Sequence, residues 1–235
     1  MNPLLVALDV NTAAEALALA DALREAVGGF KIGSRLFTAE GPAMVTQLVE
    51  RGDRVFLDLK FHDIPSTVAG AVEAAARLGV WMVNVHASGG SEMMRAARTA
   101  AADGSARAGT QPPLVIAVTV LTSLEQRVLH TVGVAEDVEA HVDRLARLAS
   151  EAGLDGVVAS PQEVVRIRRW ADKRFLIVTP GIRTGERTDD QARTAGASEA
   201  LENGASYLVV GRPIIKAADP RAAAEKIRRE IGAER

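Results

Sequence analysis

The feature that most constrains the fold is a regular alternation between two kinds of segment along the whole chain. Short apolar runs rich in Val, Ile and Leu have the length of buried strands, and they occupy residues 4–9, 30–33, 55–60, 82–86, 115–120, 156–159, 175–179 and 207–211. Between them lie longer, Ala-rich segments typical of helices, at residues 13–26, 40–51, 65–78, 91–102, 136–152, 161–170, 195–203 and 219–231. Strands that alternate with helices indicate a parallel sheet covered by helices.

About eight such units in a chain of 235 residues predict an α/β fold, a single-domain (β/α)8 barrel (TIM barrel) over residues 1–235. A doubly wound open sheet is the alternative architecture, but no G-x-G-x-x-G turn follows the first strand. No linker, low-complexity run or change of composition divides the chain. Because the active site of such a barrel forms at the C-terminal ends of its strands, the residues at those ends are the first candidates for function.

Composition narrows the classes of function. A net charge of -2 and an aromatic content of 3% argue against a nucleic-acid binder, which normally carries a basic patch or stacking aromatic residues. The chain has no cysteine, which excludes disulfides, thiolate nucleophiles and iron–sulfur clusters and fits a reducing compartment. No signal peptide is visible, and the longest apolar run, near residues 114–121, is too short to span a bilayer. We therefore expect a soluble, cytoplasmic protein that binds neither nucleic acid nor membranes.

Charged residues lie where several predicted strands end. Asp58 and Lys60 close the third run and, by the alternation of strand side chains, share one face; Asp63 follows them. Asp9 ends the first run, and Lys31 lies in the second. If these strands are neighbours, the five residues converge as an array of alternating sign. Burying charges is costly unless each finds a partner, so the array indicates a catalytic site.

A purely structural interpretation is also open for part of this array. Asp58 and Lys60 could form an internal salt bridge, and Asp63 could cap the helix that begins near Pro65. For Asp63 alone this interpretation is at least as good as catalysis, whereas for the whole array it is poor, because stability alone favours apolar residues at these positions.

A second candidate site follows the last two predicted strands. Barrel enzymes often bind phosphate there, at the N-terminus of a short extra helix. Gly211 lets the backbone approach a ligand, Arg212 supplies a fork of donors, and Pro213 suits a helix start. The other segment, Pro180-Gly181-Ile182-Arg183, follows the seventh predicted strand. Glycine and arginine are common in loops, so either segment alone is weak evidence, but two such segments at matching barrel positions indicate phosphate binding. The polar segment from Arg183 to Arg193 is typical of a mobile lid.

The segment from Asp58 to Pro65 resembles the signature of the orotidine 5′-phosphate decarboxylase family, within a wider group that shares Asp-x-Lys-x-x-Asp. The resemblance covers essentially the whole chain. It implies loss of CO2 from C6 of the pyrimidine ring of orotidine 5′-phosphate, giving uridine 5′-phosphate in pyrimidine biosynthesis, without a metal or organic cofactor. The other matching segments are Leu8-Asp9, Phe30-Lys31-Ile32-Gly33, Val83-Asn84-Val85-His86-Ala87, Val120-Leu121-Thr122-Ser123, Pro180-Gly181-Ile182-Arg183, Asp190-Gln191 and Gly211-Arg212-Pro213.

The resemblance also implies roles for the candidate residues. Lys60 would stabilise the C6 carbanion and protonate it, held charged and oriented by Lys31 and the flanking carboxylates, with Asp58 near the substrate carboxylate. In the family the second aspartate of the motif crosses a dimer interface, so Asp63 and Thr67 would complete the partner's site in a homodimer. The remaining substrate contacts would come from Asp9 and Thr122 around the ribose and base, and from Arg183, Gln191, Gly211 and Arg212 around the phosphate.

Two alternatives stay open. The first is a metal-dependent phosphosugar enzyme of the same group, such as a 3-keto-gulonate 6-phosphate decarboxylase or a hexulose-phosphate synthase. In those enzymes an acidic residue that helps to bind metal takes the position of Lys31, so a lysine disfavours Mg²⁺ at this site. The second is a barrel that binds a phosphate ligand without catalysis.

Overall fold

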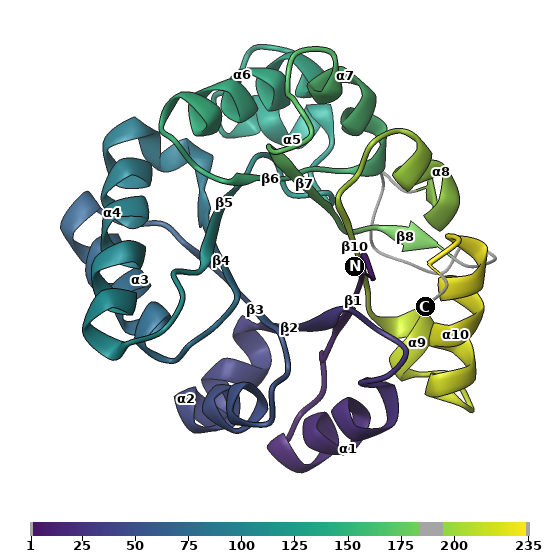
Figure 1. Cartoon of the computed structure of the whole chain (residues 1–235). Helices are drawn as coiled ribbons and strands as arrows, with labels where there is room; N and C mark the ends of the chain where they lie inside the picture. The colour runs from purple at the N-terminus through teal and green to yellow at the C-terminus, as the bar shows by residue number, and fades with distance from the viewer. Residues whose placement is uncertain (1, 184–194, 234–235) are drawn as a thin grey trace.

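The computed structural model describes residues 2–183 and 195–233, and in these residues eight parallel strands close into a barrel. The order around the barrel is β1-β10-β7-β6-β5-β4-β3-β2, and helices surround it on the outside (Figure 1). The predicted (β/α)8 fold is therefore confirmed. The barrel strands are β1 (Leu4–Ala7), β2 (Gly29–Gly33), β3 (Val55–Phe61), β4 (Met82–His86), β5 (Leu114–Val118), β6 (Gly156–Val158), β7 (Leu176–Thr179) and β10 (Tyr207–Val210).

Outside the barrel, β8 (Ile182–Arg183) and β9 (Ala195–Gly196) form a small parallel pair. Thr12 caps the first helix, since its hydroxyl accepts a hydrogen bond from the amide of Glu15 at 3.2 Å. The helices are α1 (Ala13–Leu23), α2 (Ser34–Glu50), α3 (Pro65–Arg77), α4 (Gly90–Ala108), α5 (Gln126–Thr131), α6 (Val138–Glu151), α7 (Val164–Arg168), α8 (Ala197–Glu202), α9 (Arg212–Ile215) and α10 (Pro220–Glu230), with short 3-10 helices at Ala87–Gly89 and Pro161–Glu163.

Two helices differ from the prediction. α2 begins at Ser34, although the sequence pattern predicts a start near residue 40. Gly41 has a φ of 70° inside it and Pro42 follows, so the helical pattern is broken where the chain kinks. α5 has 6 residues, and so short a helix shows too little periodicity to be recognised in a sequence. The short helix expected near Pro213 is present as α9, with 4 residues.

The core has two layers. Side chains that point outward from the strands pack against the helices, and a smaller apolar cluster fills the inside of the barrel. At the end where the strands begin, Trp81 and Tyr207 pack edge to face with ring centroids 5.1 Å apart. The interior is therefore closed with apolar side chains at that end, and space for a ligand lies at the opposite one. The interior cluster consists of Leu5, Ala7, Phe56, Met82, Ile116, Val178 and Val209.

In the described part of the chain, no helix has both the length and the apolar character needed to cross a membrane.

Candidate active site

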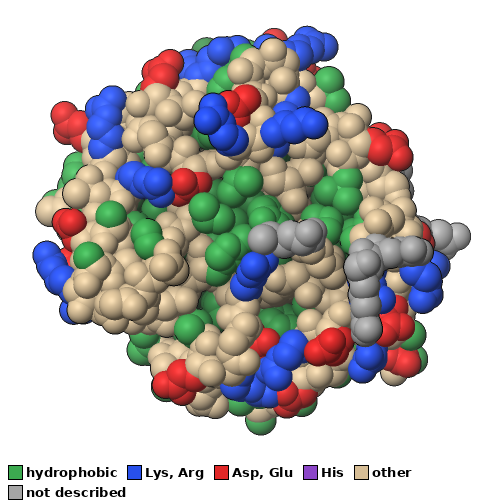
Figure 2. Space-filling view, in the orientation of Figure 1, with side chains coloured by type: hydrophobic (Ala, Val, Ile, Leu, Met, Phe, Trp, Pro, Cys, Tyr) green, Lys and Arg blue, Asp and Glu red, His purple; other side chains and the backbone are tan. Residues whose placement is uncertain are grey.

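A cavity of about 270 Å³ lies at the C-terminal ends of the barrel strands. Its floor is formed by members of the interior cluster, among them Ala7, Phe56 and Val178. In the space-filling view, hydrophobic side chains gather around the centre of the barrel face and charged side chains lie mainly towards its edge (Figure 2). An apolar floor excludes water, and charges placed above it interact more strongly than they do at an exposed surface.

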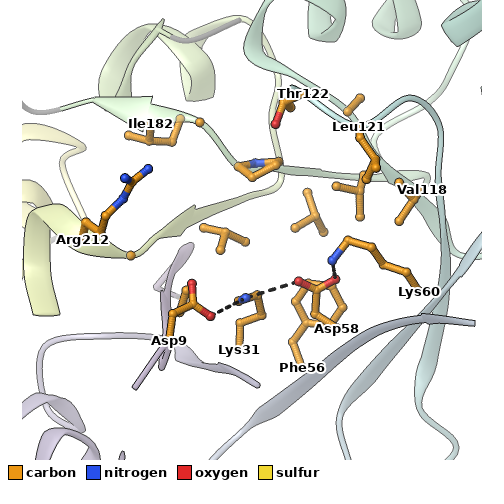
Figure 3. A pocket seen from close by; sticks show the side chains of 18 of the residues that line it. Asp9, Lys31, Phe56, Asp58, Lys60, Val118, Leu121, Thr122, Ile182 and Arg212 are labelled. Atoms are coloured by element: carbon orange, nitrogen blue, oxygen red, sulfur yellow. Dashed lines mark hydrogen bonds and ion pairs between the residues drawn. The ribbon is translucent and has the colours of Figure 1, made fainter. Parts of the chain in front are cut away.

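Four of the five predicted array residues meet in this cavity (Figure 3). Lys60 donates to Asp58 with 2.6 Å between Nζ and Oδ1, and the Nζ of Lys31 lies 3.3 Å from the other oxygen, Oδ2. Lys31 also donates to Oδ1 of Asp9 at 3.0 Å. The side chains therefore form a chain of alternating sign, Asp9–Lys31–Asp58–Lys60, as the sequence predicts.

The charge state of Lys31 follows from its surroundings. Burial by itself lowers the pKa of its ammonium group, but the carboxylates of Asp58 and Asp9 outweigh that effect, and the pKa is raised above its ordinary value. Lys31 is thus held positively charged although it is only 9% exposed. Because Asp58 has an ammonium group against each oxygen, its carboxylate is neutralised rather than open to a hard cation. Among the residues that the structure describes, no cluster of three or more His, Cys, Asp or Glu could hold a metal ion.

The backbone at Lys60 is irregular. Its φ of 52° is the only positive value found outside glycine in residues 2–183 and 195–233. The pairing of β3 with β4 also shifts there, since Leu57 pairs with Val83 and the next pair is Phe61 with Val85. Simple strand alternation, the basis of the prediction, is therefore not the full reason that Asp58 and Lys60 share a face.

Asn84 belongs to this site, although its place in the sequence predicts no role for it. It is fully buried, donates from Nδ2 to Oδ1 of Asp58 at 2.6 Å, and accepts at Oδ1 from the backbone amide of Lys60 at 2.8 Å. The signal available in the sequence is a single carboxamide within the apolar strand 82–86, on the side shared with Met82.

Asp63 and Thr67 lie apart from the cavity of their own chain, and both are exposed. Asp63 accepts a hydrogen bond from the backbone amide of Ile64 at 2.6 Å. The N-cap residue of α3, however, is Ile64, and no side chain caps this helix. The capping role considered for Asp63 is therefore wrong. The neighbouring Ile64 is 63% exposed.

The predicted phosphate-binding residues line the other end of the cavity. Arg212 and Lys60 lie at opposite ends in Figure 3, and Thr122 lies along the upper edge between them. A Cβ atom placed on Gly211 would be 3.5 Å from Ala7 and 3.7 Å from Asp9, so the protein itself leaves room for a side chain there. A glycine at this position keeps that room for a ligand. The side chain of Arg183, residue Gln191 and the rest of the predicted lid to Arg193 lie outside the described residues.

The closed barrel and the charged array in its mouth define an enzyme of the (β/α)8 class, with its site at the C-terminal ends of the strands. The sequence model of the Orotidine 5'-phosphate decarboxylase / HUMPS family matches residues 2–227, and the chain belongs to this family.

Known proteins are similar over nearly the whole length. The orotidine 5'-phosphate decarboxylase of Moorella thermoacetica is 54% identical over 232 residues, which cover 98% of this chain and 92% of that protein. The enzyme of the same name from Dichelobacter nodosus is 53% identical, with 96% and 97% covered. The crystal structure of orotidine 5'-phosphate decarboxylase from Lactobacillus acidophilus has a TM-score of 0.88 at 37% identity, with 98% of this chain and 99% of that chain covered.

The surroundings of His86 predict how stability depends on pH. Burial, the ring of His62 and the ammonium group of Lys60 lower the pKa of His86 below its ordinary value. The unfolded chain then binds a proton at a pH where the folded chain does not, so acidification through the ordinary histidine range reduces the free energy of unfolding. The penalty is complete below the folded-state pKa and absent above the unfolded-state pKa.

We expect His86→Gln to remove this contribution. Urea unfolding at about pH 5 and about pH 7.5 should show a larger loss of stability on acidification for the wild type than for the variant. Equal losses would mean that His86 has the same proton affinity in both states.

Proposed function

We propose that this chain decarboxylates orotidine 5′-phosphate to uridine 5′-phosphate without a metal or organic cofactor. The observation that carries the proposal is the position of Lys31, whose ammonium group bridges Asp9 and Asp58. The metal-dependent phosphosugar alternative requires an acidic residue there, and a second cation in that place opposes metal binding. The similar proteins that carry the decarboxylase name support the same choice.

In this mechanism the bond between C6 and the carboxylate carbon breaks, CO2 leaves, and the electron pair remains on C6. The ammonium group of Lys60 stabilises that charge from a fixed position, since it is held 2.6 Å from Asp58. Lys60 then gives a proton to C6 and recovers one from solvent. Lys31 holds the other oxygen of Asp58 and so keeps this carboxylate in place. The ammonium group of Lys60 therefore needs little reorganisation when the carbanion forms.

The rest of the substrate is placed along the cavity. Arg212 binds the phosphate at the far end, together with the backbone around Gly181 and Gly211. Asp9 contacts ribose hydroxyls and Thr122 contacts the base or ribose. The proposal includes Arg183 and Gln191 as further phosphate contacts. The length of the cavity between Arg212 and Lys60 fixes which end of the nucleotide reacts.

The proposal also includes a cytoplasmic homodimer in which Asp63 and Thr67 complete the site of the partner subunit. Both residues are exposed at the start of α3, and the apolar side chain of Ile64 between them is 63% exposed. An interface over this surface would bury the apolar side chain of Ile64 together with the two polar residues beside it.

Lys60→Ala is the direct test of the mechanism. We expect kcat to fall at least about a thousandfold, because a fixed charge that faces the developing carbanion is removed, while uridine 5′-phosphate still binds in calorimetry. Lys173→Ala, which removes an exposed lysine from a loop, is the matched control and should leave kcat unchanged. A strong chelator should not reduce the activity of the wild type, and recovery of lost activity with Mg²⁺ would favour the phosphosugar alternative.

Arg212→Ala tests the phosphate end of the cavity. Charge-assisted hydrogen bonds contribute roughly 1.5–3 kcal/mol each, so uridine 5′-phosphate should bind about ten- to a hundredfold more weakly. Binding of uridine, which has no phosphate, should change little. Arg229→Ala, on the exposed surface of α10, serves as the control. Equal losses for both ligands would remove Arg212 from the phosphate site.

Mixing two inactive variants tests the shared site. If Asp63 serves the partner's Lys60, Asp63→Ala and Lys60→Ala proteins regain activity after subunit exchange, because each mixed dimer has one intact site. With random exchange about half of the dimers are mixed, so activity should approach roughly a quarter of the wild-type value. Sedimentation shows beforehand whether the Asp63→Ala protein is dimeric. No recovery despite exchange would place Asp63 outside the partner's site.

A further inference from the structure

We propose that Asn84 is a positioning residue that fixes the geometry of the Asp58–Lys60 pair. This inference rests on the proposed decarboxylase function, because the pair is the centre of that mechanism. Asn84 acts through two hydrogen bonds: it accepts one from the backbone of Lys60 and donates one to the carboxylate of Asp58.

The first hydrogen bond compensates for a break in the sheet. Between the pairs Leu57–Val83 and Phe61–Val85, residues 58–60 of β3 lie opposite Asn84 alone. The amide of Lys60 donates to the side chain of Asn84, at 2.8 Å, at this break in the register. A lysine in the left-handed conformation persists only where its surroundings hold it, and this hydrogen bond does so.

The second hydrogen bond orients the carboxylate. Nδ2 of Asn84 and Nζ of Lys60 both contact Oδ1 of Asp58, each at 2.6 Å. Asn84 thus joins the backbone of Lys60 to the carboxylate that holds the end of its side chain. A carboxamide suits this position because it offers one acceptor and one donor without adding a charge.

The charged groups nearest Asn84 come from β3: Asp58 contacts it with its carboxylate and Lys60 with its backbone amide. Lys31 of β2 and Asp9, just after β1, continue the chain of ion pairs from Asp58, and the titratable side chain of His86 follows on β4 itself. On the other side, Asn84 pairs with the apolar Ile116 of β5. A new carboxylate at position 84 would therefore meet Asp58 directly, with the two lysines beyond it.

Asn84→Asp distinguishes positioning from simple packing. When protonated, the introduced carboxyl group can accept from the amide of Lys60 and donate to Asp58, as the carboxamide does. When ionised, it repels Asp58 at hydrogen-bond distance, so the pair loses its geometry. The ratio of variant to wild-type kcat should therefore fall about tenfold for each pH unit above the pKa of the new group. A ratio that is constant with pH would overturn the proposal.

Asn84→Leu removes both hydrogen bonds while nearly preserving volume. We expect kcat to fall about a hundredfold, as for small misplacements of catalytic groups, with little change in the affinity for uridine 5′-phosphate. Thr119→Val is the matched control: Thr119 is 4% exposed, and its hydroxyl donates to the carbonyl of Val158 at 2.9 Å, joining the residue that follows β5 to the end of β6. That variant should lose stability but retain kcat.

A kcat of Asn84→Leu within about threefold of the wild type would overturn the proposal. If this variant does not fold, the pH profile of Asn84→Asp decides. A wild-type protein without decarboxylase activity would refute the proposed function instead, and a crystal structure of Asn84→Leu would then judge the inference. Loss of the left-handed conformation at Lys60, or of its contact with Asp58, would support it, and an unchanged pair would refute it.

Discussion

The rest of the site depends on one interaction, the buried carboxylate of Asp58 between two ammonium groups. Lys60 and Lys31 contact its two oxygens above an apolar floor, and the buried charges of Lys31 and Asp58 depend on these contacts for their stabilisation. Removing Asp58 leaves the buried Lys31 beside a second ammonium group without the carboxylate between them, which costs far more than a surface ion pair contributes. Such an arrangement is stable only if the strands that carry it are fixed.

The barrel meets that requirement through its register. Ala7 pairs with Lys31 and Gly33 pairs with Asp58, so the first three strands bring the charged side chains to one level. The same level has little spare room: a Cβ atom on Gly33 would lie 3.0 Å from Nζ of Lys31. Gly33, which ends β2, therefore helps to position the charged array, because a larger side chain there would press against the ammonium group of Lys31.

The parts of this structure that could be predicted are those in which local pattern and chain order suffice. Alternating apolar runs predict the strands, and the charged residues at their ends predict the array. Asn84 could not be assigned a role because its function arises from the shift in register between β3 and β4, which is a property of two paired strands. The capping role considered for Asp63 failed for a related reason, since only the geometry shows that α3 begins without a side-chain cap.

The distribution of charge along the cavity has a consequence for the proposed reaction. Within one chain the array contains two carboxylates, Asp9 and Asp58, and two ammonium groups, Lys31 and Lys60, so its formal charge is zero. It therefore offers the substrate carboxylate little net attraction. In the proposed binding mode Arg212, which lies at the opposite end of the cavity, provides the attraction for the phosphate. Binding free energy gained at the phosphate can then hold the reacting group against Asp58, and departure of CO2 relieves that contact while Lys60 stabilises the charge left on C6.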